Sequence, residues 1–361
     1  MSCPIHSGFA ILYLSTNAER QVTERTFIMS ETKKKVIFDV DTGSDDTIAI
    51  MMGILNPEKL DVVGICSVNG NRGIEYTTEN TLRALDWLGS KVPVYKGCSL
   101  PYASTLDPWR RPRVPYGGAN GCASGHQNIH GDHLDLPVAT SKPQEQNAVS
   151  WLVDTLMNSE DKITLIPVGP LTNIAHALRI EPRIKDKIEE VVIMGGAYHV
   201  GNITAVAEFN WWIDPEAAKI VMDSGLNITL IPLDATHSAY VTGKELEDMC
   251  TCNTKAAQMT MKLVRGRIAG YGEWQEMEVK DAAPIHDALC TAYLLDPTVI
   301  NDMRDVWVDV DFSGGPCDGM SVCDVEKRHP DKQPNCHLAL HADRLKFVEL
   351  LAEAVKKEAT Y

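Results

Sequence analysis

Short apolar, β-branched runs recur along the chain from residue 36 onward. Six of them lie at 36–40, 62–68, 92–95, 163–168, 191–194 and 228–233. Helix-like stretches lie between several of these runs, at 47–55, 76–88, 148–158, 173–178 and 215–224. A strand followed by a helix, repeated, predicts βαβ units on an open, mostly parallel sheet of the α/β class. The runs are apolar throughout rather than alternating, which is typical of strands covered by helices on both faces.

The ends of the chain and one internal loop depart from this pattern. Residues 1–32 show no periodicity, which predicts a disordered N-terminal extension ahead of a single domain at 33–361. Towards the C-terminus come strand-like runs at 308–312 and 337–341 and a helix-like stretch at 345–357. The loop at 103–143 contains Gly, Pro and His and is long for a compact domain, which is typical of a functional or mobile segment.

Polar residues follow the apolar runs. Asp39 and Asp41 end the first run, Asn69 and Asn71 the second, Met194 with two glycines the fifth, and Asp234 with His237 the sixth. In open parallel sheets, ligands bind beyond the carboxyl ends of the strands. Each residue alone fits a turn or a helix cap. Their shared position at strand ends favours a ligand site at that edge of the sheet.

The first strand end carries four carboxylates in eight positions, Asp39, Asp41, Asp45 and Asp46. Asp39 and Asp41 are two apart in a strand and therefore face the same side. One or two of these acids fit a helix cap ahead of Thr47. Four acids at one chain reversal repel each other unless a cation lies between them. Oxygen ligands favour a hard divalent ion, Ca²⁺ or Mg²⁺, over zinc.

A fifth carboxylate, Asp287, follows His286 far downstream. In such a pair the aspartate can bind a metal while the imidazole donates a proton. A capping aspartate beside an uninvolved histidine is the commoner arrangement. Trp211 and Trp212, which directly follow Glu208 and Asn210 in the sequence, are more typical of a core or an interface than of a surface that stacks on a base.

Composition narrows the class of protein. The 361 residues carry a formal net charge of −15, which argues against a nucleic-acid-binding surface. No 18-residue apolar run is present, so we expect no membrane span. The apolar segment at 9–14 is too short for a signal-peptide core and lacks a basic region before it. We therefore expect a cytoplasmic protein.

Two other classes fit part of the pattern. Asp-x-Asp-Thr after a strand also resembles the Mg²⁺-dependent phosphatases of the haloacid dehalogenase superfamily. That interpretation needs a downstream lysine at a helix start and a second acidic pair, for which the sequence has no convincing candidate, and it leaves Asp45 and Asp46 unexplained. A non-catalytic protein that binds ribose or Ca²⁺ is the other alternative.

The chain as a whole resembles the nucleoside hydrolases, the inosine-uridine-preferring group in particular. The motifs that carry the resemblance cover the chain from about residue 33 and occur in the family's order: 39–46, 70–71, 169–175, 194–198, 207–210 with 214–216, and 285–287. The family implies a Ca²⁺-dependent N-ribohydrolase with an open, mostly parallel sheet. It also implies a small ribonucleoside as substrate and assembly as a homodimer or homotetramer.

The resemblance also implies roles for single residues. Asp41, Asp46, Asp287 and the carbonyl oxygen of Val168 are expected to bind the ion. Asp45 is expected to be the general base and His286 to face the leaving base. The ribose hydroxyls are expected to contact Asn71, Asn202, Glu208 and Asn210, and Met194 is expected to contact the substrate.

The sequence departs from the family at a few positions. Thr42 stands where proline is common, and Val168 where threonine often occurs. The loop with His126, His130 and His133 is longer than expected, which bears on base specificity. His130 is a further candidate for contact with the substrate. We expect purine nucleosides, 6-oxopurines such as inosine and guanosine in particular, to be the preferred class.

Overall fold

The computed structural model describes residues 33–103, 106, 131–275 and 277–359. The residues from Lys33 onward cluster as one compact unit. The predicted disordered extension at 1–32 and the candidate His130, with its neighbour His126, lie outside the described residues.

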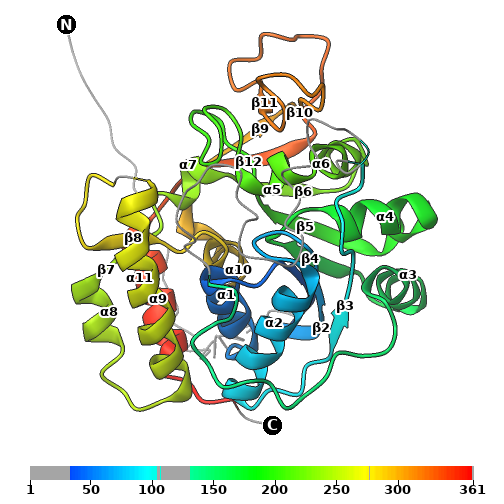
Figure 1. The fold of residues 1–361 in the computed structure, drawn as a ribbon. Helices are drawn as coiled ribbons and strands as arrows, with labels where there is room; N and C mark the ends of the chain where they lie inside the picture. The colour runs from blue at the N-terminus through cyan, green and yellow to red at the C-terminus, as the bar shows by residue number, and fades with distance from the viewer. Residues whose placement is uncertain (1–32, 104–105, 107–130, 276, 360–361) are drawn as a thin grey trace, which may run out of the picture. The chain divides into compact units, whose positions relative to one another are not determined.

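The centre of the fold is an eight-stranded sheet (Figure 1). Its order is β3 (Val94–Lys96), β2 (Leu60–Ser67), β1 (Lys34–Val40), β4 (Ile163–Pro167), β5 (Ile188–Met194), β6 (Ile228–Ile231), β12 (Cys336–Ala342) and β9 (Ile300–Val306). Neighbours run parallel except β9, which is antiparallel to β12. The predicted open, mostly parallel sheet is confirmed.

Helices cover both faces of this sheet. Strand β1 has apolar side chains on both faces of the sheet. Ile37 packs into one apolar cluster, whereas Phe38 and Val40 pack into the other. Residues of α3 (Ala148–Asn158), α4 (Thr172–Ile180) and α6 (Pro215–Met222) line the first cluster. Residues of α1 (Ser44–Ile54), α2 (Ile74–Leu88), α9 (Lys255–Trp274), α10 (Ala288–Leu295) and α11 (Arg344–Val355) line the second. A strand buried on both faces has no polar side to show, which is the physical reason for its continuous apolar run.

Several elements were not predicted from the sequence. They include α9, α10, the short helices α5 (Phe209–Ile213), α7 (Leu233–Thr236) and α8 (Gly243–Met249), and strand β9. Two antiparallel ribbons lie apart from the main sheet: β7 (Tyr240–Thr242) with β8 (Ala282–Pro284), and β10 (Val308–Val310) with β11 (Ser321–Cys323). Helix α10 is buried at seven of its eight positions. Its sequence therefore lacks the amphipathic period from which a helix can be predicted.

Candidate active site

The turn from β1 into α1 holds the four clustered aspartates. All are buried, with exposures of 2% for Asp39, 1% for Asp41, 5% for Asp45 and 0% for Asp46. The carboxylate of Asp46 accepts hydrogen bonds from the backbone N–H groups of Gly43 at 2.8 Å and Asp41 at 3.2 Å. Asp46 therefore caps the N-terminus of α1, as the sequence allowed, and its carboxylate faces the chain reversal.

Asp287 joins this turn from the other end of the sequence. It stands at the N-cap position of α10, yet its side chain makes no capping hydrogen bond there. Carboxylate oxygens of Asp45, Asp46 and Asp287 all lie within 4.8 Å of one another. The simple capping interpretation of Asp287 is therefore wrong.

Asp41 is held beside this group by the turn after β2. Its Oδ2 accepts a hydrogen bond of 2.6 Å from the backbone N–H of Asn71, and the Asn71 side chain donates to the Asp41 carbonyl at 3.3 Å. A Cβ atom on Gly70 would lie 2.1 Å from that same Oδ2. Only a glycine lets the backbone approach the carboxylate this closely.

Asp39 has a different environment from the other three. Its Oδ2 accepts a hydrogen bond of 3.0 Å from Asn173, whose amide also donates to the Ser67 carbonyl at 3.1 Å. Burial raises the pKa of Asp39 to about 8. Through Asn173 this aspartate is linked to β2 and α4, a contact that no local sequence pattern separates from those of the neighbouring aspartates.

The remaining carboxylates raise each other's affinity for protons. Burial first, and then the neighbouring carboxylates, raise the pKa values of Asp41 and Asp287 well above the usual range. Burial and the charge of Asp45 raise the pKa of Asp46 to about 7. The guanidinium of Arg267 acts in the opposite direction on the pKa of Asp287. A buried group of like charges is stabilised by a bound cation.

These donors fit a hard divalent cation. They are oxygen atoms from buried carboxylates, and the groups holding them are fixed by backbone hydrogen bonds. The carbonyl oxygen of Val168 already accepts a hydrogen bond of 2.8 Å from Asn210. A carbonyl has two lone pairs, so one remains for an ion.

Three candidate substrate contacts, Met194, Glu208 and Asn210, lie around the end of β5. The Asn210 amide bridges the carbonyls of Val168 and Met194, the second at 3.2 Å. Glu208 is 2% exposed, and its carboxylate accepts from the N–H groups of Gly196 at 3.0 Å and Asn210 at 2.8 Å. Burial raises the pKa of Glu208 to about 7. In this arrangement Glu208 caps α5 and closes the turn after β5.

The other two ribose candidates lie on either side. Asn202 is half-buried, and its Oδ1 accepts a hydrogen bond of 3.0 Å from the N–H of Phe209. Asn71 lies at the Asp41 carboxylate. The backbone carbonyl of Asn71 accepts a hydrogen bond from Arg72, and Arg72 forms an ion pair with Asp132 at 2.9 Å. The described end of the long loop is thus tied to the turn that carries Asn71.

His286 is buried beside the acidic group, with 4% of its surface exposed. Its Nδ1 lies 2.7 Å from the hydroxyl of Thr236, and its Nε2 lies 3.3 Å from the hydroxyl of Tyr271. The same tyrosine hydroxyl lies 3.1 Å from Nε2 of His237 and donates to Gln275 at 3.1 Å. Tyr271 is fully buried, so it packs in the core, as does Trp211.

Sequence reasoning missed Arg267. This arginine lies on α9, is 2% exposed, and its Nη2 lies 2.9 Å from Oδ2 of Asp45. No local motif marks it, because its partner is more than two hundred residues away in the chain. The available signal was an arginine among the apolar residues Leu263, Val264 and Ile268 of a long helix.

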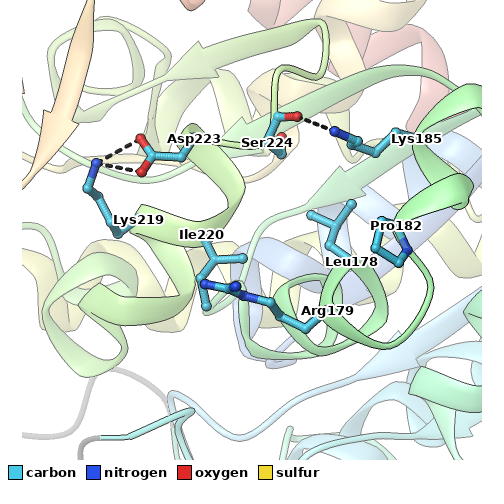
Figure 2. Close-up of a pocket in the computed structure, with 8 residues that line it drawn as sticks. All are labelled: Leu178, Arg179, Pro182, Lys185, Lys219, Ile220, Asp223 and Ser224. Atoms are coloured by element: carbon cyan, nitrogen blue, oxygen red, sulfur yellow. Dashed lines mark hydrogen bonds and ion pairs between the residues drawn. The ribbon is translucent and has the colours of Figure 1, made fainter.

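A separate cavity of about 300 Å³ lies elsewhere, at the carboxyl ends of α4 and α6 (Figure 2). Two of its lysines are already engaged: Lys219 pairs with Asp223, and Lys185 donates to the Ser224 carbonyl (Figure 2). Because each helix returns the chain to the start of the next strand, this cavity is at the amino ends of β5 and β6. The acidic cluster is at the opposite edge.

An open, mostly parallel sheet with buried carboxylates beyond its strand ends is typical of α/β proteins that bind a small molecule at that edge. The chain belongs to the inosine-uridine preferring nucleoside hydrolase family, which matches residues 36–349. It is therefore a nucleoside hydrolase, an enzyme that hydrolyses the N-glycosidic bond of ribonucleosides. Family membership removes both the phosphatase and the non-catalytic alternative.

Individual relatives agree with this assignment. The chain is 37% identical to the pyrimidine-specific ribonucleoside hydrolase RihB of Escherichia coli and of Shigella flexneri, over 90% of this chain and 97% of theirs. Among solved structures, a purine-preferring ribonucleoside hydrolase from Gardnerella vaginalis is 31% identical with a TM-score of 0.74. A plant nucleoside hydrolase is 28% identical with a TM-score of 0.76. Each solved structure covers 90% of this chain and is itself 99% covered.

No helix among the described residues has the length and apolarity needed to cross a membrane.

Proposed function

We propose that this nucleoside hydrolase depends on Ca²⁺ bound by Asp41, Asp46, Asp287 and the carbonyl of Val168. The observation that carries the proposal is the convergence of buried carboxylates from two distant parts of the chain. Ca²⁺ takes six to eight oxygen ligands in flexible geometry, and the carboxylates and the carbonyl supply several of them. When bound there, the ion would lower the pKa of a water molecule and stabilise negative charge beside the ribose.

The remaining steps belong to the chain's own residues. N-glycosidic cleavage develops an oxocarbenium-like ribosyl group, as in O-glycoside hydrolysis. Asp45 accepts the proton of the attacking water as the general base. Its Oδ2 is paired with Arg267, and this contact holds the carboxylate in one orientation. His286, one residue from Asp287, protonates or hydrogen-bonds the leaving base.

The polar residues at the ends of β2 and β5 hold the ribose. We assign contacts with the ribose hydroxyls to Asn71, Asn202, Glu208 and Asn210, and a further contact with the substrate to Met194. The backbone N–H of Asn71 donates to the Asp41 carboxylate, and the Asn210 amide donates to the carbonyls of Val168 and Met194. Hydrogen bonds fixed by the backbone keep these groups oriented before the substrate arrives, which lowers the entropy cost of reaching the reactive geometry. His130, from the long loop, is proposed to contact the substrate.

We propose purine nucleosides, 6-oxopurines in particular, as the preferred substrates. One relative is named purine-preferring and a more identical one pyrimidine-specific, so pyrimidine nucleosides are the competing class. The direct test is a panel of inosine, guanosine, adenosine, uridine and cytidine, with release of free ribose and free base as the readout. Higher kcat/KM on uridine or cytidine than on inosine would overturn the purine preference and leave the hydrolase activity standing.

We also propose that the enzyme works in the cytoplasm as a homodimer or homotetramer. Sedimentation of the purified protein decides the assembly, and a monomer at working concentration would contradict it.

A further inference from the structure

Arg267 is a buried cation in the wall of the acidic cluster. The side chain of Arg267 is 1% exposed, and the side chain of its partner Asp45 is 6% exposed. A buried arginine is tolerated only when its donors are paired. Here Nη2 lies 2.9 Å from Oδ2 of Asp45, Nε donates to the Pro284 carbonyl at 2.6 Å, and Nη1 donates to the Ser44 hydroxyl at 3.4 Å.

These contacts reach the two segments that supply the cluster. Ser44 and Asp45 open helix α1, whereas Pro284 ends β8, three residues before Asp287. The guanidinium also lies 5.5 Å from the ring centroid of Tyr271, one turn further along α9. The planar guanidinium of Arg267 is therefore held in one orientation by several directed hydrogen bonds, and it holds the Asp45 carboxylate in place.

The charge of Arg267 has a second consequence. Asp41, Asp45, Asp46 and Asp287 form a buried acidic group. Among the described residues, Arg267 forms an ion pair with this group through Asp45. A cation fixed this close repels a divalent ion instead of helping to bind it. A site optimised for ion affinity alone would not place an arginine there.

We propose that Arg267 is a positioning residue that acts on turnover through Asp45 and does not contribute to ion affinity. The inference rests on the role of Asp45 in the proposed function. It predicts a split: loss of Arg267 lowers kcat while the affinity for Ca²⁺ stays the same or rises. A merely structural ion pair predicts that both fall together, because a collapsed site loses its ligand geometry.

The test compares Arg267→Met with Arg267→Lys and with Arg265→Met as the matched control. Arg265 lies on the same helix, but its side chain is 37% exposed and pairs with Glu247 and Asp281 at the surface. Calorimetric titration of metal-free protein with Ca²⁺ at about pH 8.5 gives the affinity. Ribose release from a nucleoside gives kcat and KM, and thermal unfolding shows whether each variant folds.

We expect Arg267→Met to lower kcat by about 10²-fold with KM within roughly threefold. Arg267→Lys keeps the charge but loses the fork, so it should recover about tenfold of that loss. Arg265→Met should match the wild type. Unchanged turnover in Arg267→Met, or Ca²⁺ affinity lowered by tenfold or more, overturns the proposal. If Arg267→Met does not fold, the lysine variant is judged by the same two readouts.

A double variant tests whether the effect passes through Asp45. Adding Arg267→Met to Asp45→Asn should lower kcat no further, because residues that act as a unit are not additive. If the two substitutions lower kcat by factors that multiply, Arg267 acts independently of Asp45, and the positioning role is wrong. Wild-type protein that releases no ribose, or binds no Ca²⁺, would instead refute the proposed function itself.

Discussion

At the residue scale, four aspartates of one short motif have four different environments. Asp39 is paired with an asparagine and ties strands together, while Asp41 is held by the backbone of the next turn. Asp46 caps a helix, and Asp45 faces Arg267. The residue type is the same in every case, so neighbours contributed by other segments determine what each carboxylate does.

Asp45→Asn tests the proposed base. The amide keeps the shape of the side chain but cannot accept the proton, so we expect kcat to fall by about 10²-fold or more with substrate binding largely kept. The control is Asp135→Asn, a carboxylate that is 84% exposed. Near-normal turnover in Asp45→Asn would assign the base to another carboxylate of the cluster.

His286→Ala tests the leaving-group role. If the imidazole assists departure of the base, inosine hydrolysis should slow by about 10²-fold, while a nitrophenyl riboside, whose leaving group needs no proton, should be spared. Steady-state rates on both substrates provide the comparison. Equal losses of rate on the two substrates would mean that His286, which is hydrogen-bonded to Thr236 and Tyr271, positions the ribose or the ion instead.

At the element scale, the strand-to-helix turns are the parts that build the site. The turns after β1, β2 and β5 place backbone N–H donors beside the carboxylates of Asp46, Asp41 and Glu208 respectively. Such a turn depends on backbone that approaches closely, which excludes a side chain at Gly70. The turns, more than the helices that follow them, therefore determine the geometry of the cluster.

Gly70→Ala tests this dependence. The added methyl would overlap the Asp41 carboxylate, so we expect a loss of roughly 1–3 kcal/mol in stability and weaker Ca²⁺ binding. Gly266→Ala is the matched control, since a Cβ there meets nothing within 4 Å in helix α9 and should stabilise by up to about 1 kcal/mol. Thermal unfolding and Ca²⁺ titration measure both, and equal behaviour of the two variants contradicts the argument.

At the scale of the whole molecule, the site exists only because the sheet brings distant segments to one edge. The segments that follow the first two strands supply Asp41, Asp45, Asp46 and Asn71, and the segment after β8 supplies Asp287. These acids repel one another when no cation is bound. Folding of the metal-free protein is therefore linked to their protonation.

The metal-free protein should lose stability as the pH rises from about 4 to 8. Burial raises the pKa values of Asp46 and Glu208 to about 7, so the folded state binds these protons more tightly than the unfolded chain does. Their stabilising effect is complete below about pH 4 and is lost as the pH passes 7. We expect the melting temperature after chelation to fall by roughly 5–10 °C over this range. Protein with Ca²⁺ should show a smaller fall, and identical curves with and without Ca²⁺ would contradict the linkage.

The N-terminal extension predicted from sequence gives the last prediction. Deleting residues 1–28 should leave melting temperature and turnover within error of the full chain, because that stretch has no apolar periodicity to bury. A drop of several degrees, or a clear loss of activity, would show that it packs on the catalytic domain.

Much of the fold followed from the sequence alone. The apolar runs and the helix-like stretches between them identified the strands of the parallel sheet, since the apolar character of a doubly covered strand is a local property. The same local information marked the acidic turn, Asn71 at the end of β2, and the pair His286 and Asp287. Helices α9 and α10 were not predicted, because their burial depends on contacts with segments from the rest of the chain.

What the tertiary structure alone decided is which of these groups meet, and how. The sequence placed Asp39 with Asp41, but packing against Asn173 removed it from the cluster. Nothing local pointed to Arg267, which reaches Asp45 across more than two hundred residues. Short-range patterns determine which segments are buried. Contacts between segments far apart in the chain determine the charge and geometry of the site, because both depend on distances that only the folded sheet sets.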